Sequence, residues 1–405
     1  MPTTRILPLA PVLCGAAFVA AILMSTAPSP VIAADGEPLA IRLWPDGRVS
    51  IENHWGLRVV VSTSRPPQQS PDSPFEKHVT SRGGVDHAWS RRANDDAATW
   101  TAATWTAATD RNAIPGSIHV TSISGQDDIA AGMLVRTDGV RVALLNDPSA
   151  AGAPPAKQDA KLDVVVIPLP KDVPDADAAV TAWIKAIKPR YVLLPSQVTD
   201  EAAKSFAASI DASGEITDVD HNTFAVSQST DRAGQTRLVK MNDQPYELSE
   251  ELDSLMKQME ASCDRSQAVF SRLSANQLNF RPANGTHTPR WNAEHMMGRQ
   301  LLFFSQIYHA LDPAIPVMDL NPKQMPPDYV AAHPDWDGKE EARQMQRVSD
   351  FTRRFAYLLR GINLDVRAPG SRWTLRGLLR QMDRHYDDHT ANTKKKFELS
   401  GWPDE

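Results

Sequence analysis

The residues of this chain with the clearest capacity for chemistry are two histidines near its C-terminus, in the segment His385-Tyr-Asp-Asp-His389. On a helix, side chains at positions i and i+4 lie on one face about 6 Å apart. Two imidazoles placed in this way can hold one transition-metal ion if a third ligand arrives from a neighbouring helix, and Glu294-His295 supplies the candidate. The spacing therefore predicts a metal site made of His295, His385 and His389.

A site of three neutral imidazoles has a definite chemical character. It leaves one or more coordination positions open, as in catalytic rather than closed structural sites. Imidazole suits several divalent metals, so zinc, nickel, iron and manganese are all candidates. Such a metal can activate a bound water as a nucleophile, or activate a coordinated thiolate for transfer.

The two C-terminal histidines also admit a second interpretation. Leu378 and Met382 precede them on the same helix face, so both histidines continue a stripe of core residues. Because a buried polar group without a partner costs roughly 1 to 3 kcal/mol, these imidazoles need partners. The alternative to a metal is a pair of core histidines bonded to nearby carboxylates, namely Asp387, Asp388 or Glu294.

Other polar residues of this region are expected to lie outside the site. His309 falls on nearly the same helix face as His295 but about 21 Å further along by helical rise. His287 precedes that helix in a loop and is interpreted as a surface residue. Asp388 and Glu294 adjoin ligands, yet a residue next to an inward histidine points about 100° away, which makes both weak candidates for a general base.

Four long helical patterns would position the three histidines. The first opens at Ser249, a capping residue followed by early carboxylates. The others run over about 288–311, 338–359 and 373–399, with loops between them. Residues 249–405 are therefore predicted to form an all-α four-helix bundle.

The preceding half of the chain has a different pattern. Short apolar runs flank Asp46-Gly47, a hairpin signal, and later runs alternate strand, helix, strand, helix between 162 and 210. This order predicts a layered α/β domain over residues 38–228. Residues 64–114 are interpreted as a loop or weakly ordered insertion, and residues 229–248 as a linker.

Composition excludes some functions and suggests a compartment. A chain of 405 residues with 41% hydrophobic residues favours two globular domains, and a formal charge of -6 gives no basic excess typical of a nucleic-acid binder. Residues 1–33 have the layout of a signal peptide, so we expect a periplasmic or extracellular protein with no stable membrane span after cleavage. The alternative is an uncleaved membrane anchor, but the apolar run is shorter than the roughly 18 to 20 residues that span a bilayer. Cys263 would then be the only cysteine left, which excludes an internal disulfide and favours a buried packing role.

The C-terminal half resembles the DinB-like bundle family. That family has one histidine early in its second helix and a His-x-x-x-His pair in its fourth, and it binds a divalent metal through the three. Arg290-Trp-Asn-Ala-Glu-His295 matches the first element, and the segment from Thr374 to His389 matches the second. The resemblance implies the same three-histidine metal site. Relatives include metal-dependent thiol S-transferases and a thiol-dependent isomerase.

The N-terminal half resembles the metallo-β-lactamase fold more weakly. Val140-Arg-Val-Ala-Leu-Leu-Asn-Asp147 and Lys188-Pro-Arg-Tyr-Val-Leu-Leu-Pro195 match strands that recur in that family. Its dense His-x-His-x-Asp-His cluster is absent, because the corresponding span has only His78 and Asp86-His87. Asp147 alone takes the place of the bridging carboxylate, so the resemblance implies a degenerate domain with a structural or binding role.

Two functions follow from these patterns. The first is an exported, metal-dependent hydrolase or transferase that acts on an unknown small molecule. The alternative is a non-catalytic binding or scaffold protein, with a structural metal and a degenerate hydrolase-like domain. Dimerisation through the bundle is compatible with either function.

Overall fold

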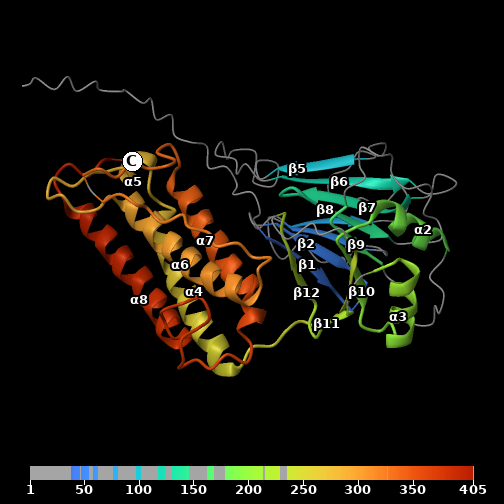
Figure 1. The fold of residues 1–405 in the computed structure, drawn as a ribbon. Coiled ribbons are helices and arrows are strands. Elements are labelled where there is room, and N and C mark those ends of the chain that lie inside the picture. The colour runs from blue at the N-terminus through green and yellow to red at the C-terminus, as the bar shows by residue number, and fades with distance from the viewer. Residues whose placement is uncertain are drawn as a thin grey trace, which may run out of the picture. The chain divides into compact units, whose positions relative to one another are not determined.

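The computed structural model describes residues 38–45, 47–53, 58–62, 76–80, 97–101, 117–124, 130–145, 162–167, 178–212, 215–228, 235–325 and 327–404. An α/β region rich in strands is followed by a helical region (Figure 1). The expected signal peptide at residues 1–33 lies outside the described residues, as do Asp86, His87 and Asp147. Among the helices within these ranges, none combines the length and hydropathy that a membrane span needs.

A five-stranded sheet has the order β12-β1-β2-β3-β4. Its strands are β1 Leu39–Leu43, β2 Val49–Glu52, β3 Arg58–Ser62, β4 Glu76–Thr80 and β12 Thr223–Val226. Strands β1 and β2 pair antiparallel with Ile41 opposite Ile51, and Gly47 lies between them with a φ of 78°. The hairpin predicted at this position is confirmed.

An eight-stranded sheet has the order β11-β13-β10-β9-β8-β7-β6-β5. Its strands are β5 Ala97–Thr101, β6 Ser117–Ser124, β7 Ala130–Thr137, β8 Val140–Leu145, β9 Val164–Val166, β10 Tyr191–Pro195, β11 Thr217–Val219 and β13 Arg237–Met241. The pairs from β5 to β8 are antiparallel, whereas those from β8 to β11 are parallel. Between β7 and β8, Asp138 and Gly139 both have positive φ, as a two-residue type I′ hairpin turn requires.

The central strands β9 and β10 of the larger sheet are buried on both faces. On one face, Val164 and Val166 join a core that the two sheets share. On the other face, Val165 packs with side chains of helices α2 (Ala178–Ile187) and α3 (Asp200–Ser209), among them Trp183 and Phe206. Successive strand residues point to opposite faces, so this all-valine strand serves both cores, as is typical of buried parallel strands.

Two predictions about loops are wrong in part. Within residues 64–114, interpreted as a loop or weakly ordered insertion, β4 pairs parallel with β3 and β5 pairs antiparallel with β6. Within residues 229–248, interpreted as a linker, β13 lies between β10 and β11 in the larger sheet. All three strands are short, and β13 also pairs with strands that are distant in sequence. Pairing with a neighbouring strand, rather than the local sequence pattern, therefore decides their structure.

The helical region contains α4 Glu250–Phe270, α5 Ala275–Leu278, α6 Pro289–Leu311, α7 Gly338–Arg354 and α8 Leu375–Lys394, with 3-10 turns at Ala356–Leu359 and Lys395–Glu398. Helix α4 contacts α7 and α8, and α6 contacts the same two helices. The side chains of Ser249, Thr288 and Thr374 cap the first turns of α4, α6 and α8. Asp337 caps α7 in the same way, accepting from the Glu340 backbone nitrogen at 3.0 Å. All four predicted helix starts therefore coincide with a side-chain cap, as their residue types favour.

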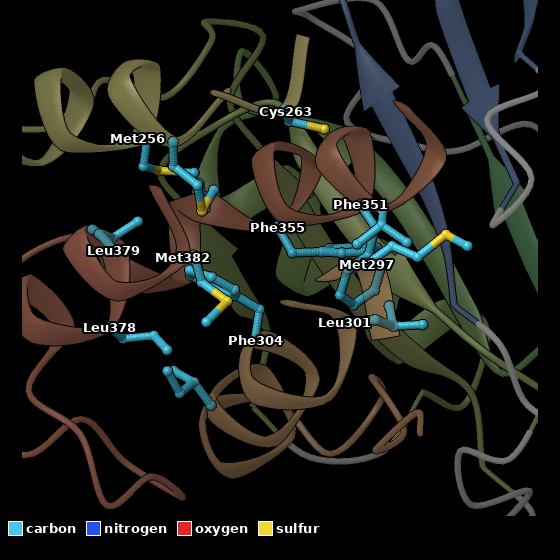
Figure 2. Packing of buried hydrophobic residues seen from close by; sticks show 14 of the residues in the cluster. Met256, Cys263, Met297, Leu301, Phe304, Phe351, Phe355, Leu378, Leu379 and Met382 are labelled. Carbon is cyan, nitrogen blue, oxygen red and sulfur yellow. The ribbon is translucent and has the colours of Figure 1, made fainter. Parts of the chain in front are cut away.

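The helices share an apolar core (Figure 2). Met256 and Cys263 of α4, Phe304 of α6, Phe351 of α7 and Met382 of α8 are all at most 2% exposed. Burial raises the pKa of the Cys263 thiol to about 12, so this side chain stays protonated at neutral pH. The predicted packing role of Cys263 agrees with this burial.

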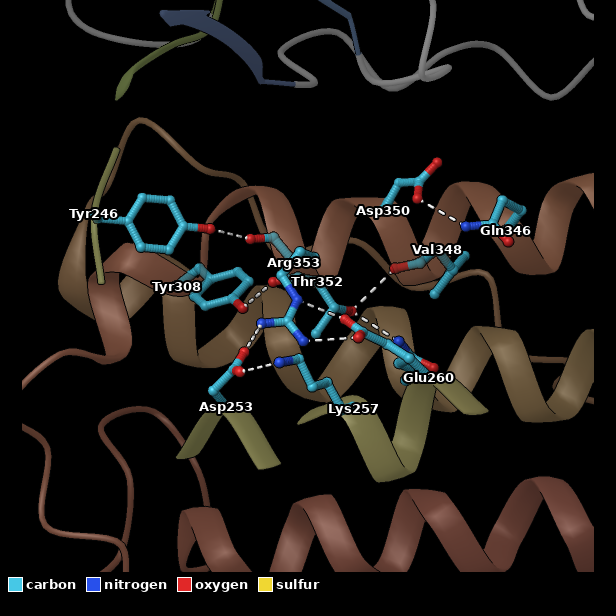
Figure 3. Close-up of polar contacts among 11 residues, drawn as sticks. Tyr246, Asp253, Lys257, Glu260, Tyr308, Gln346, Val348, Asp350, Thr352 and Arg353 are labelled. Carbon is cyan, nitrogen blue, oxygen red and sulfur yellow. Dashed lines mark hydrogen bonds and ion pairs between the residues drawn. The ribbon is translucent and has the colours of Figure 1, made fainter. Parts of the chain in front are cut away.

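Polar contacts join α7 to its neighbours at the end of that helix (Figure 3). The Arg353 guanidinium donates to both carboxylate oxygens of Glu260, at 2.6 and 2.7 Å, and to Asp253 at 2.6 Å. The Tyr308 hydroxyl of α6 donates to the Thr352 carbonyl at 2.6 Å. A bidentate contact between a guanidinium and a carboxylate fixes the orientation of the two groups as well as their distance. These bonds therefore set the register of α7 against α4.

Candidate metal centre

The three histidines of the predicted metal site lie together in the structure. His295 comes from α6, and His385 and His389 come from α8. One possible ligand atom from each lies within 4.8 Å of the other two. The ring centroids are 4.5 Å apart for His385 and His389, and 5.0 Å apart for His295 and either partner. Three imidazole nitrogens this close to one another are candidate ligands for one transition-metal ion.

Helix α8 presents its pair of histidines through its apolar face. Leu375, Leu378 and Met382 are buried in the helical core, and His385 and His389 follow them on the same face as half-buried side chains. The predicted continuation of the core stripe into the histidine pair is confirmed. Because the leucines and the methionine anchor the helix, both imidazoles are held toward α6 rather than toward solvent.

Helix α6 carries His295 in a stack of aromatic rings. The Trp291 ring lies 4.4 Å from the His295 ring at an interplanar angle of 15°. Its indole Nε1 donates to the Gln324 carbonyl at 3.0 Å, which fixes the indole plane. A rigid indole beside His295 limits the directions in which that imidazole can turn.

Two asparagines bind the outer nitrogens of the histidines. His295 Nδ1 lies 2.8 Å from Asn321 Oδ1, and His389 Nδ1 lies 2.8 Å from Asn292 Oδ1. The Asn321 amide nitrogen donates to the Pro322 carbonyl, and that of Asn292 donates to Thr393 Oγ1. These bonds orient each amide so that its oxygen faces the imidazole and accepts from Nδ1–H. The Nε2 atoms are left as electron-pair donors, the usual arrangement around a metal-bound histidine.

His385 provides an independent test of whether the site suits a metal. Its Nε2 is buried and has no hydrogen-bond partner. Burial lowers the pKa of His385, His295 and His389 to about 4 each, with the neighbouring histidines adding to the effect. All three rings are therefore neutral at physiological pH, as metal ligation requires. A neutral, unpartnered nitrogen beside two oriented imidazoles fits a divalent transition metal.

The alternative of histidines bonded to carboxylates does not describe this site. Asp387 is exposed and binds the Arg265 guanidinium at 2.9 and 3.0 Å. Glu294 accepts a hydrogen bond from the Tyr329 hydroxyl at 2.6 Å. Asp388 is exposed, and no carboxylate of the described residues belongs to the histidine cluster. The expectation that Asp388 and Glu294, each adjacent to a histidine of the site, point away from the imidazoles agrees with this.

His309 and His287, which were both expected to lie outside the site, differ in outcome. His309 bonds through Nδ1 to the Ile315 carbonyl at 2.8 Å and takes no part in the cluster, as predicted. The interpretation of His287 as a surface residue is wrong in part, because its side chain is half-buried. Its ring lies 3.7 Å from the Trp291 ring, and its Nδ1 is buried without a partner. The loop before α6 folds back on the first turn of the helix, which helical periodicity could not predict.

Sequence reasoning missed the two asparagines and a glycine that brings one of them into place. Asn292 lies three residues before His295, so its position on the same helix face was a usable signal. Asn321 lies in the Pro-rich connection after α6, where no periodicity exists. A Cβ on Gly298 would lie 2.7 Å from Asn321 Cα and 2.8 Å from its backbone nitrogen. Only glycine lets the connection approach α6 closely enough for Asn321 to reach His295.

We expect Gly298→Ala to weaken both the fold and the metal site. The added methyl group meets backbone atoms, which must shift at a cost of about 1 to 3 kcal/mol, while alanine gains about 1 kcal/mol in helix propensity. Displacing Asn321 should also weaken metal binding about 10- to 100-fold, as loss of an outer hydrogen-bond partner does. Thermal unfolding and metal titration measure the two effects. Asn321→Ala is the matched control, since it should lower affinity without the steric shift; unchanged affinity in both variants would contradict the assignment.

Comparison with known proteins agrees with the resemblance of the helical region. Residues 258–391 match the family model of the DinB superfamily. Among solved structures, the chain is similar to a Thermotoga maritima protein described as a Zn-dependent hydrolase of the metallo-β-lactamase superfamily. That similarity has 10% identity and a TM-score of 0.30, and it covers 50% of this chain and 98% of the other. No curated protein matches the chain.

Proposed function

We propose that this chain, whose residues 258–391 match the DinB superfamily, is a metal-binding protein that acts as a hydrolase or transferase on a small molecule. The observation that carries the proposal is His385 Nε2, buried without a partner beside two imidazoles whose Nδ1 atoms are bonded to asparagines. A divalent transition metal satisfies that nitrogen and takes His295 and His389 as its other ligands. Zinc, nickel, iron and manganese all suit this donor set.

Three histidine ligands favour a catalytic metal site with an open coordination position over a structural site whose positions are all filled by protein. When bound, the metal would supply Lewis-acid activation of a water or of a thiolate at an open coordination position. The protein contributes three neutral donors, and the outer Asn292 and Asn321 are amides rather than carboxylates. Among the described residues, no carboxylate oxygen belongs to the cluster. The centre therefore keeps the full positive charge of its ion, which favours binding of an anionic nucleophile or substrate.

A scaffold role is the second candidate, and one observation favours it. Glu294, the acid nearest in sequence to His295, is engaged by Tyr329, and burial raises its pKa. Removal of a proton from a metal-bound water would then depend on solvent or on the substrate. A metal that only stabilises the helices would need no such base.

The proposal also covers the arrangement of the helices and the layering of the sheets. We propose that residues 249–405 form a four-helix bundle, on the mutual contacts of α4, α6, α7 and α8. For residues 38–228 we propose the layering of a degenerate metallo-β-lactamase-like domain, on the core shared by two sheets and the helices on the outer face of the larger one. Export of the mature protein, as the N-terminal sequence pattern suggests, completes the proposal.

The test is metal content of the full mature chain, purified without chelator and without an affinity histidine tag. Mass spectrometry should find about one equivalent of a divalent transition metal per chain. Replacement by Co²⁺ then separates the two candidate functions, because an open site changes its visible spectrum when a small anion such as azide binds, and a closed site does not. Absence of metal after attempted loading would overturn both candidates.

A further inference from the structure

A lysine close to the metal centre is buried without an anionic partner. Lys396 lies in the 3-10 turn Lys395–Glu398 after α8 and is 2% exposed. Its Nζ donates to the backbone and side-chain oxygens of Asn392, both at 3.0 Å. Both acceptors are neutral, and within the described part of the chain no carboxylate forms an ion pair with Lys396. Burial lowers its pKa to about 8. Burying an ammonium group costs free energy unless an anion is paired with it, so an anionic ligand would stabilise the buried Lys396 side chain.

The ammonium group lies on the same side of α8 as the metal ligands. Lys396 follows His389 by seven residues, which returns it to within about 20° of the same direction. Its contacts with Asn392 show that the side chain extends back toward the helix N-terminus. Asn392 is three residues after His389, so the ammonium sits about one helical turn, roughly 5 Å, beyond that ligand. The charge of Lys396 is felt at His389, where it adds to burial and the neighbouring histidines in lowering the pKa.

His287 supplies a second polar group at this level. Its ring stacks on Trp291, one turn before His295 on α6, and its Nδ1 is buried without a hydrogen-bond partner. The positive charge of Lys396 also reaches His287, where it adds to burial in lowering the pKa. Asn292 near the start of α6 bonds to His389 and to Thr393 near the end of α8, so His287 before α6 and Lys396 after α8 lie at the same end of these two helices, beyond the three histidines. Both can donate to the same anion.

We propose that Lys396 and His287 form an anion-binding subsite, which holds the carboxylate of a small substrate whose other end reaches the metal. This inference rests on the proposed function, because it gives that site its substrate class. It extends the charge argument, since a metal with only neutral ligands and an unpaired lysine together leave an excess of positive charge. A compact organic anion with a metal-binding group two or three carbons from its carboxylate spans the separation of about one helical turn.

A purely structural role for Lys396 would be to cap the last carbonyls of α8 through Asn392. The two roles differ in a measurable way, because a cap makes no distinction between ligands of different charge. The experiment uses full-length protein loaded with Co²⁺ and two probes of nearly equal size, 3-mercaptopropionate and its neutral amide. Each thiolate that binds Co²⁺ produces a charge-transfer band, from which its Kd is obtained.

The wild-type protein should bind the carboxylate probe at least about 10-fold more tightly than the amide, the range of a hydrogen bond to a charged group. Lys396→Met should abolish that preference and leave the Kd of the amide unchanged, while Lys396→Arg should retain it in part. His287→Ala should reduce it. Lys395→Met is the matched control, since it removes an exposed charge one residue away and should preserve the preference.

The outcomes separate the two proposals. If Co²⁺ does not bind, the proposed function fails, and the subsite falls with it. If Co²⁺ binds and both probes bind equally to wild type, or if Lys396→Met keeps the preference, the metal centre stands and the anion subsite is wrong. Because Lys396→Met could destabilise α8, thermal unfolding of the metal-free variant is measured beside it. A folded Lys396→Arg variant keeps the test decisive.

Discussion

Replacing His385 by alanine should lower the affinity for a divalent metal about 100- to 1000-fold. Structural zinc sites with four ligands have apparent binding free energies of about 10 to 16 kcal/mol, or roughly 3 to 4 kcal/mol per ligand, which corresponds to this factor. The pair His295 and His389 that remains is oriented by Asn321 and Asn292, but two imidazoles cannot hold an ion as three do. Isothermal titration with Zn²⁺ measures the change.

Thermal unfolding provides the second readout of His385→Ala. A ligand at 100 times its Kd stabilises the folded protein by about 2.7 kcal/mol, so Zn²⁺ should raise the Tm of wild type but not of the variant. His309→Ala is the matched control, because His309 bonds to the Ile315 carbonyl and lies outside the cluster. Equal metal affinity in His385→Ala and His309→Ala would remove His385 from the site.

The helices and the histidine cluster could be predicted because their signals are local. Capping residues such as Ser249, Thr288 and Thr374 mark helix starts within one turn. The spacing of His385 and His389 alone predicts that both lie on one helix face. The contact of His295 with that pair needed a tertiary assumption, that α6 and α8 are neighbours. The family resemblance supplied it.

The features that escaped prediction depend on contacts between distant segments. Asn321 reaches His295 across 26 residues, through a connection with no periodic pattern. Strand β13 pairs with β10 in a sheet begun more than 100 residues earlier, and nothing in its polar surroundings marks it as a strand. Likewise, His287 is half-buried because its loop folds over Trp291. Local patterns carry no record of such packing.

Replacing Glu341 by alanine should destabilise the helical region by about 3 to 5 kcal/mol, the usual cost of removing one partner from a buried ion pair. Arg290 of α6 and Glu341 of α7 are both 0% exposed, and the guanidinium Nη1 donates to Glu341 Oε1 at 2.5 Å. The same guanidinium donates to Asn279 Oδ1 at 2.7 Å and to the Trp336 carbonyl at 2.6 Å. Without Glu341, the Arg290 charge stays in an apolar interior with only neutral acceptors.

The loss should also reach the metal centre, because this network holds the connection between α6 and α7 in place. Arg290 binds carbonyls of Pro334 and Trp336 at the end of that connection, and Asn321 near its middle binds His295. We therefore expect weaker metal binding in Glu341→Ala as well as lower stability. Chemical denaturation gives the free energy of unfolding, and titration with Zn²⁺ gives the affinity.

Two further variants, Glu341→Gln and Lys339→Ala, test whether the buried ion pair itself causes the loss of stability. Glu341→Gln keeps an oxygen that can accept from Arg290, so it should cost less than Glu341→Ala. It also removes the negative charge of Glu341 while keeping a hydrogen-bond acceptor for Arg290, so it separates the contribution of the charge from that of the hydrogen bond. Lys339→Ala, on the exposed face of the same first turn of α7, should change the free energy of unfolding by less than about 0.5 kcal/mol. If Glu341→Ala were no more damaging than Lys339→Ala, the buried pair would not be what joins α6, α7 and their connection into one support for the metal site.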